Sequence, residues 1–265
     1  MLSRQKAKPF IKWVGGKRSL LDTLTDRLPL KYDRYNELFL GGGAFFFNTA
    51  PISATLCDAN ERLCTTYEVV RDYVDLLIEA LAIHEKNHCH KYYYVQRGVF
   101  CADMNPVDLA ATFIYLNKTC FNGLYRVNKS GGFNVPIGTM GNSAILDECL
   151  LRAASAALKN ADIINTSFEK VVPLSNGFYY LDPPYHKTYT DYVAGGFGED
   201  MHEKLAEYCG QIDRVRGYFM LSNSDTPFIR DLYKGFKIEE VNASRSISCK
   251  GNGRGKTGEL LIRNY

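Results

Sequence analysis

The stretch Tyr179-Tyr180-Leu181-Asp182-Pro183-Pro184-Tyr185 decides both the fold and the function that we expect. Its first half, with Gly177 and Phe178 before it, is apolar and aromatic and predicts a buried strand. Proline cannot donate to a sheet ladder, so the strand must end at Asp182. A carboxylate, main-chain carbonyls and an aromatic ring therefore lie at the carboxyl end of a strand, where open α/β sheets bind their ligands.

These groups match an amine on an aromatic base. Such an amine offers two N–H donors in the plane of a ring, for which Asp182 and the Pro183 carbonyl are acceptors, and Tyr185 offers a face for stacking. The alternative is an ordinary strand-ending turn, in which Asp and Pro are common. Asp-Pro-Pro-Tyr directly after a hydrophobic strand is much rarer, so we favour a ligand site.

Composition indicates a globular chain. Its 265 residues are 46% hydrophobic and 13% aromatic, enough for one sizeable core and a smaller second domain. Eight cysteines without a Cys-x-x-Cys pair favour the reduced thiols of a cytosol over a disulfide framework or zinc knuckle. We find no apolar signal segment and no stretch of membrane-spanning length. The net charge of +3 does not decide for or against nucleic acid.

Two glycine-containing turns indicate ligand binding in the N-terminal part. Residues 35–40 predict a strand that runs into Gly41-Gly42-Gly43 and a helix, the usual start of a doubly wound nucleotide-binding sheet. A second strand, 53–57, ends in Asp58, which is placed to accept hydrogen bonds from ribose hydroxyls or, alternatively, to cap the next helix. Residues 10–17 end in Gly-Gly-Lys before a helix, a turn that suits a carboxylate or phosphate.

A long segment separates the glycine loop from Asp182. It exceeds what two strand–helix units require, so we infer an insertion over residues 62–143. Apolar residues recur at helical spacing over residues 60–81, and the pattern predicts a further helix that begins at Asn105-Pro106. His84 and His88 share a helix face, but without a third ligand a solvated helix end is favoured over a metal site.

The segment 121–136 is rich in Asn, Gly, Arg and Lys with interleaved aromatic residues, which predicts a hairpin or long loop. Its side chains suit base edges and phosphates, although a surface hairpin without a ligand is the plainer alternative. Further on, the pattern predicts helices at 144–158, 199–212 and 226–233 and strands at 162–165, 218–221, 236–243 and 259–264. The basic segment 245–256 is either a DNA-ordered loop or a polar hairpin.

Eight motifs appear in the order typical of one family: 10–17, 39–43, Asp58, 121–126, 133–136, 182–185, 221–223 and 245–248. Together they resemble the Dam-type (D12 class) DNA adenine-N6 methyltransferases over nearly the whole chain. The resemblance implies an α/β, Rossmann-like S-adenosylmethionine-dependent methyltransferase sheet, with a catalytic domain at 1–61 and 144–265. It also implies an inserted, mainly helical target-recognition domain at 62–143.

The implied activity is methyl transfer from S-adenosylmethionine to N6 of a flipped adenine in double-stranded DNA, within GATC, without a metal. A monomer in the cytoplasm of a bacterium, or of the host of a mobile element, is expected, with restriction-modification among its roles. The matching catalytic positions are Asp182, Pro183 and Tyr185. The matching cofactor positions are Trp13, Lys17, Phe39, Gly41, Gly43, Asp58, Phe168 and Asp182. The matching DNA positions are Lys12, Phe121, Asn122, Leu124, Arg126, Asn134, Pro136 and Arg245.

This chain departs from the family pattern at 138–140, which lacks an arginine often found there, and after Tyr185, where the loop is shorter than in close relatives. The nearest alternative is an amine methyltransferase that acts on RNA or on a protein glutamine. A catalytically silent DNA-binding module is the alternative from another class. A dehydrogenase is weakest, because Phe46 replaces the third glycine of the dinucleotide fingerprint.

Overall fold

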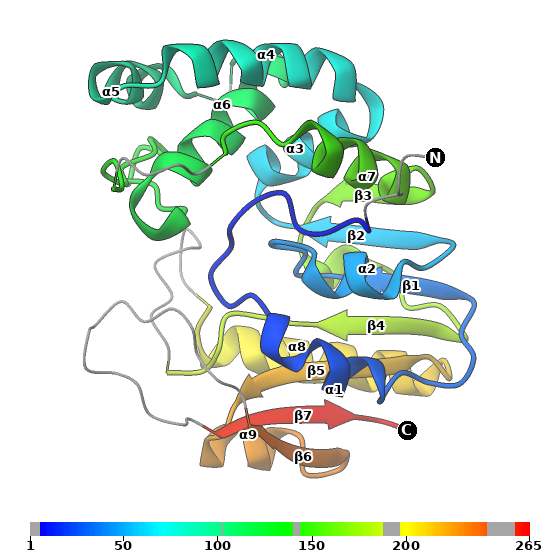
Figure 1. The fold of residues 1–265 in the computed structure, drawn as a ribbon. Helices are drawn as coiled ribbons and strands as arrows, with labels where there is room; N and C mark the ends of the chain where they lie inside the picture. Colours follow the sequence, from blue (N-terminus) through cyan, green and yellow to red (C-terminus); the bar gives the residue numbers. More distant parts are fainter. Residues whose placement is uncertain (1–5, 102, 140–143, 188–196, 243–257) are drawn as a thin grey trace. The chain divides into compact units, whose positions relative to one another are not determined.

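The computed structural model describes residues 6–101, 103–139, 144–187, 197–242 and 258–265 (Figure 1). The chain forms two compact units. We call Met1–Gly16, Gly41–Ala50 and Asn60–Asn165 the first unit, and Lys17–Leu40, Pro51–Ala59 and Thr166–Tyr265 the second unit.

The second unit is built on a sheet. Its described strands are β1 (Arg34–Glu37), β2 (Ala54–Asp58), β4 (Gly177–Leu181), β5 (Tyr218–Ser224), β6 (Lys237–Asn242) and β7 (Gly258–Arg263). They lie in the order β2-β1-β4-β5-β7-β6. The first four are parallel, and β7 runs antiparallel between β5 and β6.

The strand order reverses direction between β1 and β4. From β1 the chain moves outward to β2, whereas from β4 it moves outward to β5 on the other side. The carboxyl ends of the adjacent strands β1 and β4 therefore form a topological switch point, where open α/β sheets bind ligands. Asp182 follows directly after β4, and Phe39 lies two residues after the end of β1. The predicted α/β fold class is confirmed.

Helices cover both faces of this sheet. Figure 1 shows α1 (Leu21–Thr25) in front of the strands and α8 (Glu199–Arg214) behind them. Helix α8 forms because its apolar residues recur at helical spacing, and Leu205, Tyr208, Cys209 and Ile212 are buried in the main core cluster. A shorter helix, α9 (Pro227–Leu232), begins with Thr226, whose hydroxyl accepts the Ile229 N–H. The helix predicted after Lys17 is shorter than expected, a 3₁₀ turn followed by α1.

The first unit is mainly helical. Its elements are α2 (Ala44–Thr49), α3 (Glu61–Asp72), α4 (Val74–Asn87), α5 (His90–Val99), α6 (Pro106–Thr119), α7 (Glu148–Leu158) and β3 (Ala161–Asn165). Helix α6, which is buried along most of its length, is the centre around which α3, α4 and α5 pack. The helical spacing predicted over 60–81 is confirmed, and it is divided between two helices: the backbone leaves the helical region at Tyr73, and α4 begins at Val74.

The prediction of a solvated helix end at His84 is also wrong. His84 is only 7% exposed and its ring stacks on Tyr115 with centroids 4.8 Å apart. Its Nδ1 lies 3.0 Å from the Tyr92 hydroxyl, and the Nδ1 of His88 lies 2.9 Å from the Tyr115 hydroxyl. The two histidines thus belong to a buried hydrogen-bonded aromatic cluster.

Two buried histidines should make the free energy of unfolding depend on pH. Burial lowers the pKa of His84 and of His202 to about 4, from an ordinary value of 6.5. Between these values the unfolded chain binds more protons, so the stabilisation is complete above pH 6.5 and decreases as the pH falls toward 4. We expect a loss of about 2 kcal/mol per histidine at pH 5.

The measurement is urea unfolding at pH 7.5 and pH 5.0. The double variant His84→Gln with His202→Gln should have a flatter pH dependence, and the exposed His90→Gln should match the unsubstituted chain. An unchanged pH dependence in the double variant would contradict the assignment.

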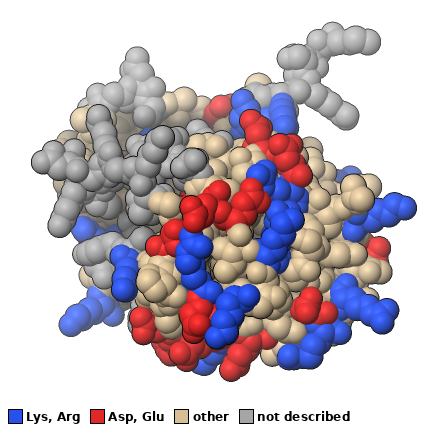
Figure 2. Space-filling model, turned by 90° about the horizontal axis from the view of Figure 1, so that it is seen from below, with Lys and Arg blue, Asp and Glu red and all other residues tan. Residues whose placement is uncertain are grey.

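The charged side chains are mixed in sign. On the face seen in Figure 2, Lys and Arg are interspersed with Asp and Glu. Several basic side chains in the second unit are paired: Arg27 and Arg263 with Glu239, and Arg230 with Asp225. Within the described ranges, no helix has both the length and the apolar character needed to cross a membrane.

Candidate active site

The carboxylate of Asp182 follows the last residue of β4 and contacts Lys17. The ammonium Nζ of Lys17 lies 2.7 Å from each of the two carboxylate oxygens. The Lys17 side chain is 8% exposed and that of Asp182 is 20% exposed, so the ion pair is shielded but the carboxylate remains reachable. The sequence placed these two residues 165 positions apart, and the second unit brings them together.

Two opposing effects act on this carboxylate. Burial raises the pKa of Asp182 above its ordinary value, and the Lys17 ammonium opposes that rise. Without Lys17, the charged form would be still less favourable. The lysine therefore favours the ionised form of a buried acceptor.

Tyr185 lies beside the ion pair of Lys17 and Asp182. The Lys17 ammonium lies 4.8 Å from the centroid of its ring, a cation–π contact. Its hydroxyl donates to Oε1 of Glu259 on β7. Burial and the nearby Asp182 and Glu259 carboxylates raise the pKa of Tyr185 well above its ordinary value, so the phenol remains a donor. Pro183, between these residues, is buried.

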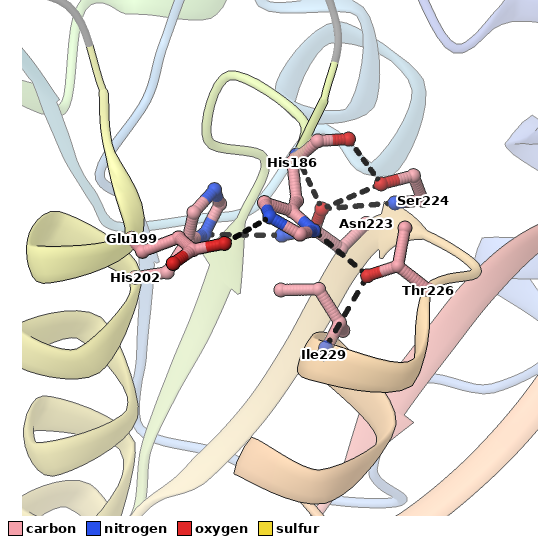
Figure 3. A network of polar contacts seen from close by, with 7 residues as sticks. All are labelled: His186, Glu199, His202, Asn223, Ser224, Thr226 and Ile229. Carbon is pink, nitrogen blue, oxygen red and sulfur yellow. Dashed lines mark hydrogen bonds and ion pairs between the residues drawn. The ribbon is translucent and has the colours of Figure 1, made fainter.

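The next residue, His186, was not predicted and is the centre of a polar network (Figure 3). Its ring is 6% exposed, with Nδ1 2.8 Å from Thr226 Oγ1 and Nε2 3.0 Å from Glu199 Oε1. Its main-chain N–H donates to Oδ1 of Asn223 (3.1 Å), and its carbonyl accepts from the Ser224 hydroxyl (2.7 Å). The turn after Asp-Pro-Pro-Tyr is thus fixed to β5, α8 and α9.

The predicted cofactor positions Phe39, Asp58 and Phe168 belong to the second unit: Phe39 lies just after β1, Asp58 ends β2, and Phe168 begins a short 3₁₀ turn, Phe168–Lys170. The rings of Phe39 and Phe168 are 5.5 Å apart, and Phe168 is 3% exposed. Asp58 is the last residue of β2. It does not cap the following helix, because Asn60 supplies the side chain that accepts the Leu63 N–H. The plainer interpretation of Asp58 is therefore wrong.

The other predicted cofactor positions, Trp13, Gly41 and Gly43, belong to the first unit. Trp13 is partly buried, and its ring stacks on Tyr125 with centroids 5.6 Å apart. Gly41 has φ +47°, and a Cβ there would come within 2.6 Å of the indole, so only glycine fits. Gly43 takes the N-cap position of α2 in the left-handed conformation.

The predicted hairpin at 121–136 is confirmed in the first unit. Isolated bridges join Cys120 to Ile137 and Val127 to Phe133, and the Asn134 N–H donates to the Arg126 carbonyl. The expected DNA-binding residues lie along it. Phe121, Asn122, Arg126 and Pro136 are exposed, whereas Leu124 and Asn134 are partly buried.

A buried amide, which no sequence pattern indicated, holds this hairpin. Asn117 on α6 is 1% exposed, accepts the Lys12 main-chain N–H (2.8 Å) and donates to the carbonyls of Lys12 (2.8 Å) and Gly123 (3.2 Å). The two expected DNA-contacting segments of the first unit are therefore joined. Lys12 itself is exposed. Arg245 lies outside the described residues.

A family model and several known proteins match this chain over most of its length. Residues 13–247 match the D12 class N6 adenine-specific DNA methyltransferase family. The chain belongs to this family. It is 40% identical to the type II methyltransferase M.MjaIII of Methanocaldococcus jannaschii (98% of this chain, 100% of the relative). It is 37% identical to M1.LlaDCHI of Lactococcus lactis subsp. cremoris (97% and 95%) and 33% identical to the DNA adenine methylase of Escherichia coli K12 (97% and 95%).

As a member of this methyltransferase family, the chain places its Asp-Pro-Pro-Tyr motif at the carboxyl end of a central parallel strand. Among the residues that the structure describes, no group of three or more His, Cys, Asp or Glu side chains is arranged to hold a metal ion.

Proposed function

We propose that this methyltransferase transfers a methyl group from S-adenosylmethionine to N6 of an adenine that is flipped out of double-stranded DNA. The observation that carries the proposal is the shielded but reachable Asp182 carboxylate beside the Tyr185 ring at the end of β4. Flipping the base costs a few kcal/mol, which a shaped and hydrogen-bonding pocket repays.

In this proposal Asp182, Pro183 and Tyr185 act on the amine. Its lone pair is delocalised into the ring, so it is a weak nucleophile. Acceptors at the Asp182 carboxylate and the Pro183 carbonyl orient its two protons and favour a tetrahedral nitrogen, while Tyr185 stacks on the base. Positioning and electrostatics supply most of the rate, without a covalent enzyme intermediate.

The chemistry of the second unit's side chains fits the proposed cofactor, whose sulfonium supplies an electrophilic methyl group. Lys17 offers an ammonium for a carboxylate, Asp58 accepts from ribose hydroxyls, and Phe39 and Phe168 offer apolar surface for adenine. We also assign cofactor binding to Trp13, Gly41 and Gly43. The two glycines allow the backbone of their loop to approach the cofactor closely.

We propose that residues 62–143 act as the target-recognition segment and that the target is GATC. The exposed hairpin residues Phe121, Asn122 and Arg126 supply an apolar wedge, an amide and a guanidinium, the groups that read or separate bases. The names of three relatives, two type II methyltransferases and a DNA adenine methylase, support a DNA substrate.

The exposed Arg126 should matter for DNA binding. Its Nε donates to Asn134 Oδ1 at 2.7 Å, which aims the guanidinium without neutralising it. Arg126→Ala should weaken binding to target DNA about tenfold, as loss of one base or phosphate contact does. Arg152→Ala, at an arginine already paired with Asp75 and Glu148, is the control. Equal affinities of the two variants in a fluorescence-anisotropy titration would contradict the role.

A substrate panel tests the proposed reaction. The purified chain should incorporate labelled methyl groups into unmethylated duplex DNA and not into RNA or a glutamine-containing peptide. Incorporation into either of these instead would favour the corresponding amine-methyltransferase alternative. Binding of DNA without binding of S-adenosylmethionine, and with no incorporation anywhere, would favour the silent DNA-binding module.

A further inference from the structure

Glu259 is a buried carboxylate in an otherwise apolar stretch of strand. It is 6% exposed on β7, which has neighbours on both sides, and Leu260, Leu261 and Ile262 after it are fully buried. Burial of a carboxylate is unfavourable unless the group is hydrogen-bonded. An apolar residue would serve the sheet better, so the glutamate needs a reason other than folding.

One residue that contacts this carboxylate is Tyr185. Its hydroxyl donates to Glu259 Oε1 across 74 residues of sequence, while Lys17 lies over its ring. The ring is therefore held at two places, by its hydroxyl and through its π face. A tyrosine ring that is fixed in this way has lost the rotation about its side-chain bonds that would otherwise oppose ordered stacking.

The backbone around Tyr185 is anchored to the same strand pair. Ser224 on β5 is the register partner of Glu259, and its hydroxyl donates to the carbonyl of His186. Asn223 accepts the His186 N–H. Consecutive residues, Tyr185 by its side chain and His186 by its main chain, are thus bound to the facing ends of β5 and β7.

We propose that Glu259 is a positioning residue that holds the Tyr185 ring in the orientation needed to stack on the substrate base. This inference rests on the proposed function, in which Tyr185 contacts the base. Glu259 is buried and accepts from the hydroxyl of the ring, and in this proposal it does not contact DNA. Its loss should therefore lower the rate of methyl transfer more than the affinity for DNA.

The test compares E259A, E259Q, Y185F and E259A/Y185F by single-turnover methylation with saturating DNA and S-adenosylmethionine. Loss of a hydrogen bond to a charged group predicts a rate about tenfold lower in E259A and in Y185F. E259Q keeps an acceptor oxygen and should stay within about threefold of the unsubstituted chain. E259A should change the rate of Y185F by less than about twofold. The Kd for DNA should stay within about twofold throughout.

Independent, multiplying effects of the two substitutions on rate would overturn the proposal. An unsubstituted rate in Y185F would do so as well, whether or not E259A folds. Urea unfolding of the same four variants gives a second double-mutant cycle, in the free energy of unfolding, which does not depend on methylation. If the unsubstituted chain does not methylate DNA, the proposed function fails while this cycle still reports the contact. Coupling in stability without coupling in rate would reduce Glu259 to a structural role.

Discussion

Replacing Asp182 by alanine should lower the single-turnover rate of methyl transfer by about 10³-fold or more. In the proposed function the substitution removes the acceptor that orients the amine, a carboxylate that directly follows β4 and contacts Lys17. Binding of DNA should be much less affected, because the expected DNA contacts lie mainly on the hairpin of the first unit. The measurements are a quenched-flow methylation assay and a DNA-binding titration on the same preparation.

Two controls separate the role of Asp182 from general damage. Asp182→Asn has nearly the same shape and keeps one acceptor oxygen, so it should retain more activity than Asp182→Ala. Asp225→Ala removes a carboxylate of the same unit that is paired with Arg230, and it should retain activity close to that of the unsubstituted chain. Turnover by Asp182→Ala near the unsubstituted rate would remove Asp182 from the mechanism.

Replacing Lys17 by methionine should shift the acid limb of the pH–rate profile to higher pH. The ionised form of Asp182 is the acceptor, burial raises its pKa, and the Lys17 ammonium opposes that rise. Without the ammonium, the pKa of Asp182 rises further, so the carboxylate is protonated at a higher pH. The expected shift is about 1–3 pH units.

The same substitution should weaken binding of S-adenosylmethionine by about tenfold or more, because one charge-assisted contact is lost. Lys17→Arg keeps a cation and should keep the acid limb near its original position. Isothermal titration measures the cofactor affinity, and kcat/KM from pH 5 to pH 9 measures the limb. An unmoved acid limb in Lys17→Met would contradict the coupling between the two side chains.

Sequence reasoning recovered the fold because its main signals are local. The apolar run of β4 ends in Asp-Pro-Pro, which permits only one strand end, and Gly41 has a conformation that few other residues adopt. Helix α6 begins where Asn105-Pro106 predicted, because the Asn side chain caps it and proline suits the first turn. The central strands and most helices were therefore predicted within a few residues.

Sequence reasoning missed features that depend on distant contacts. Nothing near Glu259 indicates that a hydroxyl 74 residues away will use it, and the polar contacts of His186 reach 13 to 40 residues along the chain. Asn117 contacts Lys12 across 105 residues. The histidines at 84 and 88 were misjudged because Tyr92 and Tyr115, which bury and bind them, lie on other helices.

The most direct test of the account is methylation of unmethylated duplex DNA with labelled S-adenosylmethionine, followed by sequencing that reports every modified adenine. We expect N6-methyladenine only within GATC, and none in DNA treated with Asp182→Ala. Methylation at another sequence would retain the chemistry and reject the proposed target. Absence of N6-methyladenine, with a folded chain that binds the cofactor, would contradict the central claim.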